Sequence, residues 1–205
     1  GAWEHLGETD ETLGKLDGPR RLATSPGGDV FVVDNHAQVQ RWGSDGTPLE
    51  VWPVDDRMPQ LSDVAGGADD PCVAGSRVVA CLAPGRRTAW SATPAADGWL
   101  VAGDGSTDEW AVVDLAEQRV YRFSRGGQAL GDWSLAPGGG FTSVADVAVD
   151  GERLYYVDRG ARRIKIVGLD GQTRAPGEIE VQGDAERVAA RDGKLYALTR
   201  EGWIW

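Results

Sequence analysis

A pattern of strands and turns recurs along this chain and restricts the fold more than any other feature. The stretches LATSPGGDVFVVDNHAQVQRWGSDG (22–46) and VAVDGERLYYVDRGARRIKIVGLDG (147–171) share one order. Each has an apolar strand, a glycine turn, a second apolar strand that ends in Asp, and a third strand. Residues 99–127 repeat this order, residues 188–205 repeat most of it, and residues 71–90 are a degenerate copy. The chain therefore contains five units.

The spacing of these units predicts a β-propeller. The positions that close the second strands are Asp34, Leu82, Asp114, Asp158 and Thr199. They recur about every 41 residues, a period typical of four-stranded antiparallel blades. The second strands are apolar on both faces, as expected for strands that lie between two neighbouring blades. We predict an all-β fold, a propeller of about five blades, in one domain over residues 1–205. The expected blades are residues 17–54, 61–92, 97–135, 143–182, and 184–205 together with 1–8.

The two ends of the chain are expected to meet. The last unit stops at its third strand, in Trp203-Ile204-Trp205, and so lacks an outer strand. The N-terminal GAWEHLG resembles the outer strands PLEVWPV (48–54) and ALGDWSL (129–135). We predict that it pairs with the last blade, which closes the ring and covers an exposed sheet edge.

The repeat resembles a known family. LDGPRRLATSPGGDVFVVDNHAQVQRW and DVAVDGERLYYVDRGARRIKIV are similar to NHL repeats, in which a strand that ends in Asp precedes an Arg-rich third strand. The resemblance implies a platform that binds protein, RNA or glycan, or an enzyme like the gluconolactonase-like and amidating-lyase-like propellers, which hold Ca²⁺ or Zn²⁺. Such families usually have six blades, so either this ring has five or one blade lies outside this sequence.

Charge excludes two classes of partner. The net charge of −11 and the pI of about 4.6 oppose binding to nucleic acid or to anionic lipid, because both require clustered Lys and Arg. No apolar run approaches the roughly 18 residues of a membrane helix. We expect no nucleic-acid partner and no direct membrane insertion.

The metal-ligand content is low. His5 and His36 are the only histidines, so zinc, which needs several His, Cys or carboxylate ligands, is not supported. A gluconolactonase-like calcium site resembles a Glu, Asn and Asp cluster, and this chain has one Asn. We assign no catalytic residue, metal ligand or cofactor, with Ca²⁺ as a minor alternative.

The central channel is the first candidate site. The residues before the innermost strands are Arg21, Asp70, Gly98, Asp146 and Arg187. Two carboxylates thus face two guanidinium groups, which favours structural ion pairs. A small anionic or zwitterionic ligand and a divalent cation are the alternatives.

The loop faces are the second candidate site. The long stretches 53–70 and 136–146 are expected to be loops, where binding residues concentrate. Two tryptophans depart from the repeat pattern and are candidates for exposed binding residues. The loop-face candidates are Asp55, Asp56, Asp63, Asp69, Trp99 and Trp110.

Two further features concern single residues. Asp34, Asp114 and Asp158 close strands, where Asp accepts hydrogen bonds from following backbone N–H groups. Cys72 and Cys81 fall on adjacent strands of one blade. If paired, they imply an oxidising, extracytoplasmic or secreted location, whereas two buried thiols fit the cytoplasm.

From these features we expect a recognition or scaffold module that binds a protein or other macromolecular partner through its loop faces, and not an enzyme. One alternative is a cation-dependent hydrolase or lyase of the gluconolactonase-like type at the channel mouth. Another is a propeller subunit or domain of a larger assembly.

Overall fold

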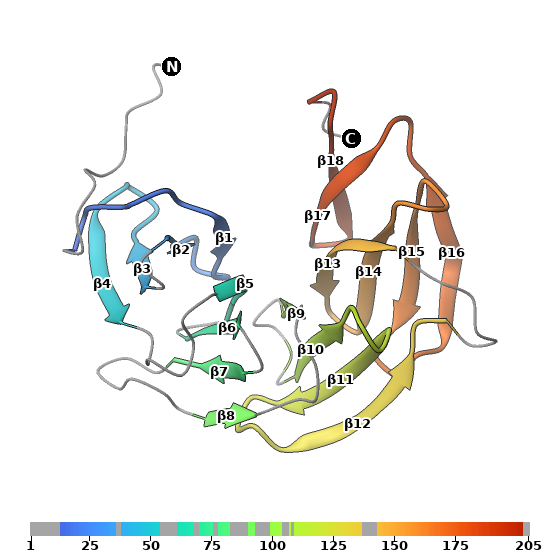
Figure 1. The fold of residues 1–205 in the computed structure, drawn as a ribbon, viewed down its shortest axis with the longest axis horizontal. Coiled ribbons are helices and arrows are strands. Elements are labelled where there is room, and N and C mark those ends of the chain that lie inside the picture. The colour runs from blue at the N-terminus through green and yellow to red at the C-terminus, as the bar shows by residue number, and fades with distance from the viewer. Residues whose placement is uncertain are drawn as a thin grey trace.

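The protein is a β-propeller of four-stranded antiparallel blades, which confirms the predicted fold (Figure 1). The computed structural model describes residues 13–35, 38–53, 61–67, 70–75, 78–82, 90–92, 99–103, 107, 109–136 and 143–202. In these residues four sheets have four strands each and the last has two. No helix in the described part is long and apolar enough to cross a membrane.

The strands follow the chain from the channel outwards in each blade. The first blade contains β1 (Arg21–Thr24), β2 (Val30–Val33), β3 (Gln38–Trp42) and β4 (Pro48–Pro53). The second contains β5 (Leu61–Gly66), β6 (Pro71–Gly75), β7 (Val78–Cys81) and β8 (Trp90–Ala92). The third contains β9 (Trp99–Ala102), β10 (Glu109–Asp114), β11 (Arg119–Ser124) and β12 (Ala129–Ser134). The fourth contains β13 (Val144–Asp150), β14 (Arg153–Asp158), β15 (Arg163–Gly168) and β16 (Thr173–Glu180), and the fifth β17 (Ala185–Arg191) and β18 (Lys194–Thr199).

The core lies between the blades. Tyr156 and Leu154 of β14 pack towards the third blade, whereas Tyr155 and Val157 of the same strand pack towards the fifth. Successive side chains of a strand point to opposite faces, so a strand between two blades must be apolar at every position. This is why the second strands lack the alternation of a half-exposed sheet.

The closing Asp residues set the turns after β10 and β14. The Asp114 carboxylate accepts hydrogen bonds from the backbone N–H groups of Ala116 and Glu117, both at 2.8 Å. The Asp158 carboxylate accepts one from Ala161 at 3.2 Å. Asp34 differs, because its carboxylate accepts from the Gln38 side chain at 2.7 Å and from the Asp17 backbone at 3.4 Å.

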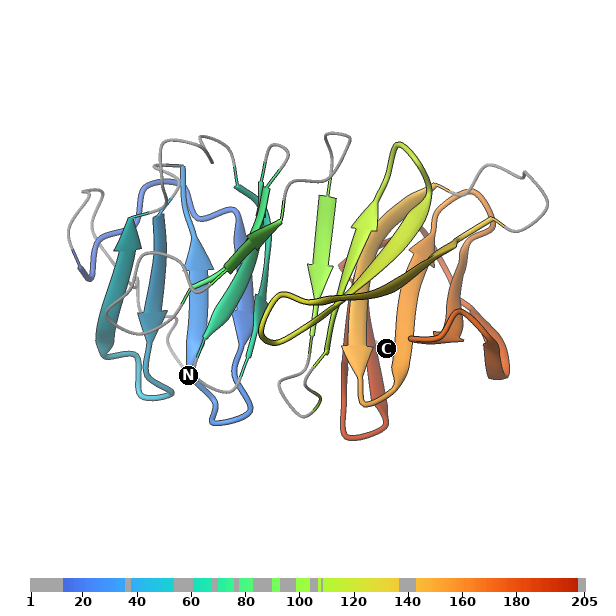
Figure 2. The same cartoon turned by 90° about the horizontal axis from the view of Figure 1, so that it is seen from below.

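The five blades form an arc with two ends. The inner strands β1, β5, β9, β13 and β17 contact one another in this order, and β1 and β17 lie at the ends of the arc (Figure 1). Seen from below, the blades stand side by side, with the turns gathered at two opposite faces (Figure 2). The Arg191 guanidinium joins the ends by donating to the Pro26 carbonyl at 2.9 Å and the Ser25 carbonyl at 3.5 Å.

Residues 13–17, which we call the N-terminal strap, lie on the first blade. The Gly14 N–H donates to the Gln40 side-chain oxygen at 3.0 Å, and the Gln40 amide donates to the Lys15 carbonyl. At the other end of the strap, the Asn35 N–H donates to the Asp17 carbonyl at 2.8 Å. Gln40 pairs with Val32, on the face of the blade opposite to the one that packs on the second blade. The strap therefore covers Gln40 of β3 on the face at the open end of the arc and leaves Leu22 of β1 exposed.

The second blade corrects the sequence-based assignment. Val78–Cys81 was predicted as a second strand, but it is the third strand of its blade, and Pro71–Gly75 is the second. The stretch 53–70 is not one loop, because Leu61–Gly66 is the inner strand, and the stretch 136–146 likewise runs into β13. The predicted pairing of residues 1–8 with the last blade, and residues 203–205, lie outside the described residues.

Candidate functional site

One position on each inner strand is equivalent from blade to blade, and in four of the five blades it holds a charged residue. These residues lie opposite or beside the second-strand residue that precedes the closing position, as the pairs Arg21–Val33, Asp63–Ala74, Leu100–Val113 and Arg187–Leu198 show. Asp146 takes this position in the fourth blade, where β13 bulges between Val144 and Val147. In order around the arc these positions hold Arg21, Asp63, Leu100, Asp146 and Arg187. The four charged residues line the cavity, whereas Leu100 is buried in the core between the third and fourth blades.

Asp63 connects the second and third blades. Its carboxylate accepts a 2.9 Å hydrogen bond from the backbone N–H of Val101 on β9, and its other oxygen lies 3.6 Å from the Arg21 Nε. Burial raises the pKa of Asp63 to about 7, and the Asp146 carboxylate contributes in the same direction. The Val101 N–H and the Arg21 guanidinium oppose this rise without cancelling it.

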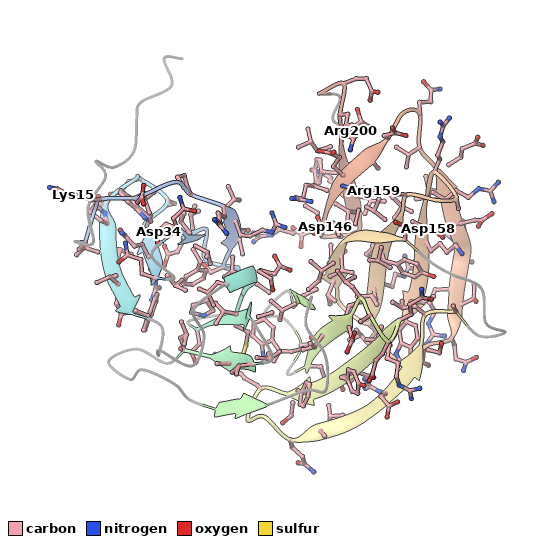
Figure 3. All side chains as sticks on the ribbon, viewed as in Figure 1. Lys15, Asp34, Asp146, Asp158, Arg159 and Arg200 are labelled. Atoms are coloured by element: carbon pink, nitrogen blue, oxygen red, sulfur yellow. A yellow bond between two sulfur atoms is a disulfide. The ribbon has the colours of Figure 1, made fainter. Side chains whose placement is uncertain are left out.

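Asp146 repeats this arrangement between the fourth and fifth blades. Its carboxylate accepts a 2.8 Å hydrogen bond from the backbone N–H of Val188 on β17. Burial raises its pKa, whereas the Val188 N–H and the Arg187 and Arg21 guanidinium groups lower it. Figure 3 shows Asp146 on the inner side of β13, towards the channel. Both carboxylates are therefore used to hold one blade against the next.

One predicted channel residue and one predicted loop-face residue need correction. Asp70 lies in the β5–β6 connection, where its carboxylate is 3.9 Å from Arg125, and it does not line the channel. Asp63, which was predicted on a loop face, takes its place. Arg21, Asp146 and Arg187 line the channel cavity, and Gly98 lies outside the described residues.

The predicted loop-face residues do not form a site in the described part. Trp110 is only 4% exposed and packs in the core between the second and third blades, so its predicted exposure is wrong. Gly67 and Gly103 make room for it, since a Cβ at Gly103 would lie 2.4 Å from the Trp110 ring. Asp55, Asp56 and Asp69 lie outside the described residues, as does the Trp99 side chain.

A slot between the first and last blades is a second feature of the molecule, and the sequence did not predict it. A cavity of about 800 Å³ runs from the channel into this slot. Leu22, which is 70% exposed, is on one wall, and Tyr196 and Leu198, 45% and 42% exposed, are on the other. The cavity volume is within the range of small-ligand and peptide pockets. The slot depends on the arc being open, which no local sequence signal reveals.

The charges along the slot differ from those of the whole chain. Its walls carry Arg20, Arg187 and Arg191, and the exposed carboxylate of Asp192 lies 3.7 Å from Arg191. Asp150 accepts hydrogen bonds from the Asp192 and Gly193 backbone N–H groups at 3.2 and 2.7 Å. The Arg187 guanidinium donates to a backbone carbonyl, that of Glu186, at 2.9 Å. The cavity lining carries four arginines, Arg20, Arg21, Arg187 and Arg191, and four aspartates, so it is close to neutral although the chain has a net charge of −11.

The described residues lack a metal-binding cluster, and the two cysteines are paired. The described residues contain no group of three or more His, Cys, Asp or Glu side chains placed to hold a metal ion. Cys72 and Cys81 face each other on β6 and β7 and are joined by a disulfide.

Comparison with known proteins defines the class of fold. No family model and no curated protein matches the sequence. Among solved structures, Raptor from Chaetomium thermophilum is similar, with a TM-score of 0.66 and 12% identity over 90% of this chain and 19% of that one. The Pan2 WD40 domain from Neurospora crassa gives a TM-score of 0.65 and 9% identity over 88% of this chain and 56% of that one. This chain spans less than two thirds of either protein, and the likeness shows a propeller fold.

Proposed function

We propose that this propeller is a non-catalytic recognition module that binds a protein partner through the slot between its first and last blades. The observation that carries the proposal is the gathering of Leu22, Tyr196 and Leu198 in one cavity. Large apolar side chains that are grouped and exposed mark interaction sites, whereas scattered ones do not. This surface replaces the loop faces as the proposed binding site.

The polar groups of the channel support binding over catalysis. Asp63 and Asp146 each accept a backbone N–H of the next blade, so their roles in packing account for their burial. A second candidate function, a cation-dependent hydrolase at the channel mouth, is favoured by one observation, the electrostatic contact between these two buried carboxylates. Arg21 and Arg187 beside them weigh against it, because they already supply positive charge.

The finer assignments are also proposals. The NHL type is supported by basic third strands whose side chains pair within their own blades, such as Arg41 with Asp29 and Arg122 with Glu109. The Cys72–Cys81 disulfide supports an extracytoplasmic location. An assembly role, in which this chain is one part of a larger complex, would use the same slot as an interface.

Affinity capture with matched variants tests the proposed function. Leu22→Asp places a charge in the slot, and Leu49→Asp makes the same change at a residue that is also exposed but does not line the cavity. We expect a protein captured by the wild type and by Leu49→Asp to be lost, at least tenfold, with Leu22→Asp. If Leu22→Asp retains the same partners at the same levels, the slot is not the binding site.

A further inference from the structure

The slot has a specific chemical character. Its walls combine aliphatic and aromatic side chains, Leu22, Leu198 and Tyr196, with the guanidinium groups of Arg20 and Arg187. Leu198 lies opposite Arg187 in the β17–β18 pairing, and Tyr196 lies opposite Ala189, so all four point to the same face of the last blade. Three aspartates of the same cavity, Asp63, Asp146 and Asp150, already accept backbone N–H groups. A segment that fits here therefore needs apolar side chains, with acidic residues placed close to the arginines.

The first twelve residues of this chain have that composition. GAWEHLGETDET contains Trp3 and Leu6, together with Glu4, Glu8, Asp10 and Glu11, and no Lys or Arg. It is thus apolar and acidic, which complements the slot in both respects. The remainder of the chain carries all 21 Lys and Arg residues.

The N-terminal strap connects this segment to the first blade at the open end of the arc. Gly14 and Lys15 are bonded to Gln40, on the side of the first blade that faces away from the second. In Figure 3 Lys15 lies on the first blade, and Asp146 lies on the opposite side of the opening. Twelve extended residues span up to about 40 Å, several times the roughly 10 Å between packed sheets. The chain is therefore long enough to reach the slot from Leu13.

We infer that residues 1–11 of this chain occupy the slot, with Trp3 and Leu6 against Leu22, Leu198 and Tyr196 and the acidic residues beside Arg20 and Arg187. The segment is an internal ligand that a partner must displace. Its regulation of partner binding rests on the proposed function, but its occupancy of the slot does not. A tethered ligand is present at a high effective concentration, so even a weak site is filled.

Binding in trans tests the inference. The chain lacking residues 1–11 is titrated into a labelled peptide, GAWEHLGETDET, and fluorescence anisotropy is recorded. We expect saturable binding that weakens at least tenfold with Leu198→Asp or Tyr196→Ser, and that weakens with Arg187→Glu and with added salt. Leu130→Asp, at a comparably exposed residue on β12 that does not line the cavity, should leave it unchanged. Circular dichroism and thermal unfolding establish that each variant is folded.

Several results would overturn the inference. No saturable binding, or equal weakening by Leu198→Asp and Leu130→Asp, would show that residues 1–11 do not use the slot. Concentration-dependent dimerisation of the shortened chain that Leu198→Asp abolishes, without peptide binding, would assign the slot to a second copy. Peptide binding in the absence of any captured partner would uphold the inference and leave the proposed function without support.

Discussion

At the residue scale, the same hydrogen bond between neighbouring blades occurs twice in the channel. Asp63 and Asp146 occupy equivalent positions, and each accepts a hydrogen bond from a valine N–H of the following blade, Val101 or Val188. Carboxylates near a channel are often interpreted as ligands or catalysts. Here the same geometry appears twice with a backbone partner, which indicates a structural connection between blades.

The pKa of Asp63 predicts how stability depends on pH. Its folded value is about 7, against about 3.8 for an ordinary Asp, so the folded state binds more protons than the unfolded state between these values. The free energy of unfolding should therefore fall as pH rises from 4 to 7, because proton binding then favours the folded state less. Asp63→Asn keeps an acceptor for the Val101 N–H and should flatten this fall. Urea unfolding at pH 4, 5.5 and 7 measures it, and an unchanged pH dependence would contradict the assignment.

The residues that sequence analysis misplaced have a physical explanation. Trp110 departs from the repeat and was expected to be exposed, but Gly67 and Gly103 leave the space that its ring fills. These glycines directly follow β5 and β9, so their role can be recognised only once the two strands are known to lie beside Trp110. Arg21, Asp146 and Arg187 could be placed in the channel because they precede clear apolar strands in blades with the regular spacing.

At the scale of elements, a polar residue that closes the second strand is common to the blades whose strands were correctly ordered. The strands β2, β10 and β14 are each followed by or end in Asp, and β18 ends in Thr199. The second blade lacks this residue, and its strands PCVAG and VVAC are both short and apolar. Because neither length nor composition distinguishes these two strands, the sequence predicts VVAC as the second strand. The same shift places Asp70, in place of Asp63, at the channel position.

The turn after β10 should depend on its Asp. Asp114 is fully buried and accepts two backbone N–H groups. Asp114→Ala should lower the free energy of unfolding by about 1–3 kcal/mol, because the backbone N–H groups of Ala116 and Glu117 lose a buried acceptor. Asp45→Ala is the control, because Asp45 also accepts a turn N–H, from Thr47, but is exposed to solvent. Chemical denaturation of both variants should show a much smaller loss for Asp45→Ala, and equal losses would refute the role given to burial.

At the scale of the whole molecule, the open arc determines what the protein offers to a ligand. The repeat predicted the blades, but the slot arises from the relation between the first and last of them, more than 150 residues apart in sequence, as the Arg191–Ser25 contact shows. A closed ring would bury the face that carries Leu22. In the open arc Leu22 is 70% exposed and lines the cavity, so this face is available to a ligand.

Metal binding by the channel is tested by thermal unfolding of the intact protein. Ca²⁺, Mg²⁺, Mn²⁺ and Zn²⁺, each compared with a chelator, should leave Tm unchanged, because Asp63 and Asp146 are already engaged by backbone N–H groups. A ligand at 100 times its Kd would add about 2.7 kcal/mol, or about 5–10 °C in Tm for a chain of this size. A rise of that size that Asp146→Ala removes would favour the hydrolase alternative.

The contact that joins the two ends of the arc has a consequence for how the opening responds to its surroundings. The Arg191 side chain donates to the carbonyl oxygens of Ser25 and Pro26, which carry no net charge and do not titrate. The contact between Arg191 and these carbonyl groups should therefore persist from acidic to neutral pH. It should also persist at high ionic strength, where attraction between exposed charges is screened. The slot would keep its width while the attraction of its arginines for an acidic segment declined, so salt would release the occupant without separating the two ends of the arc.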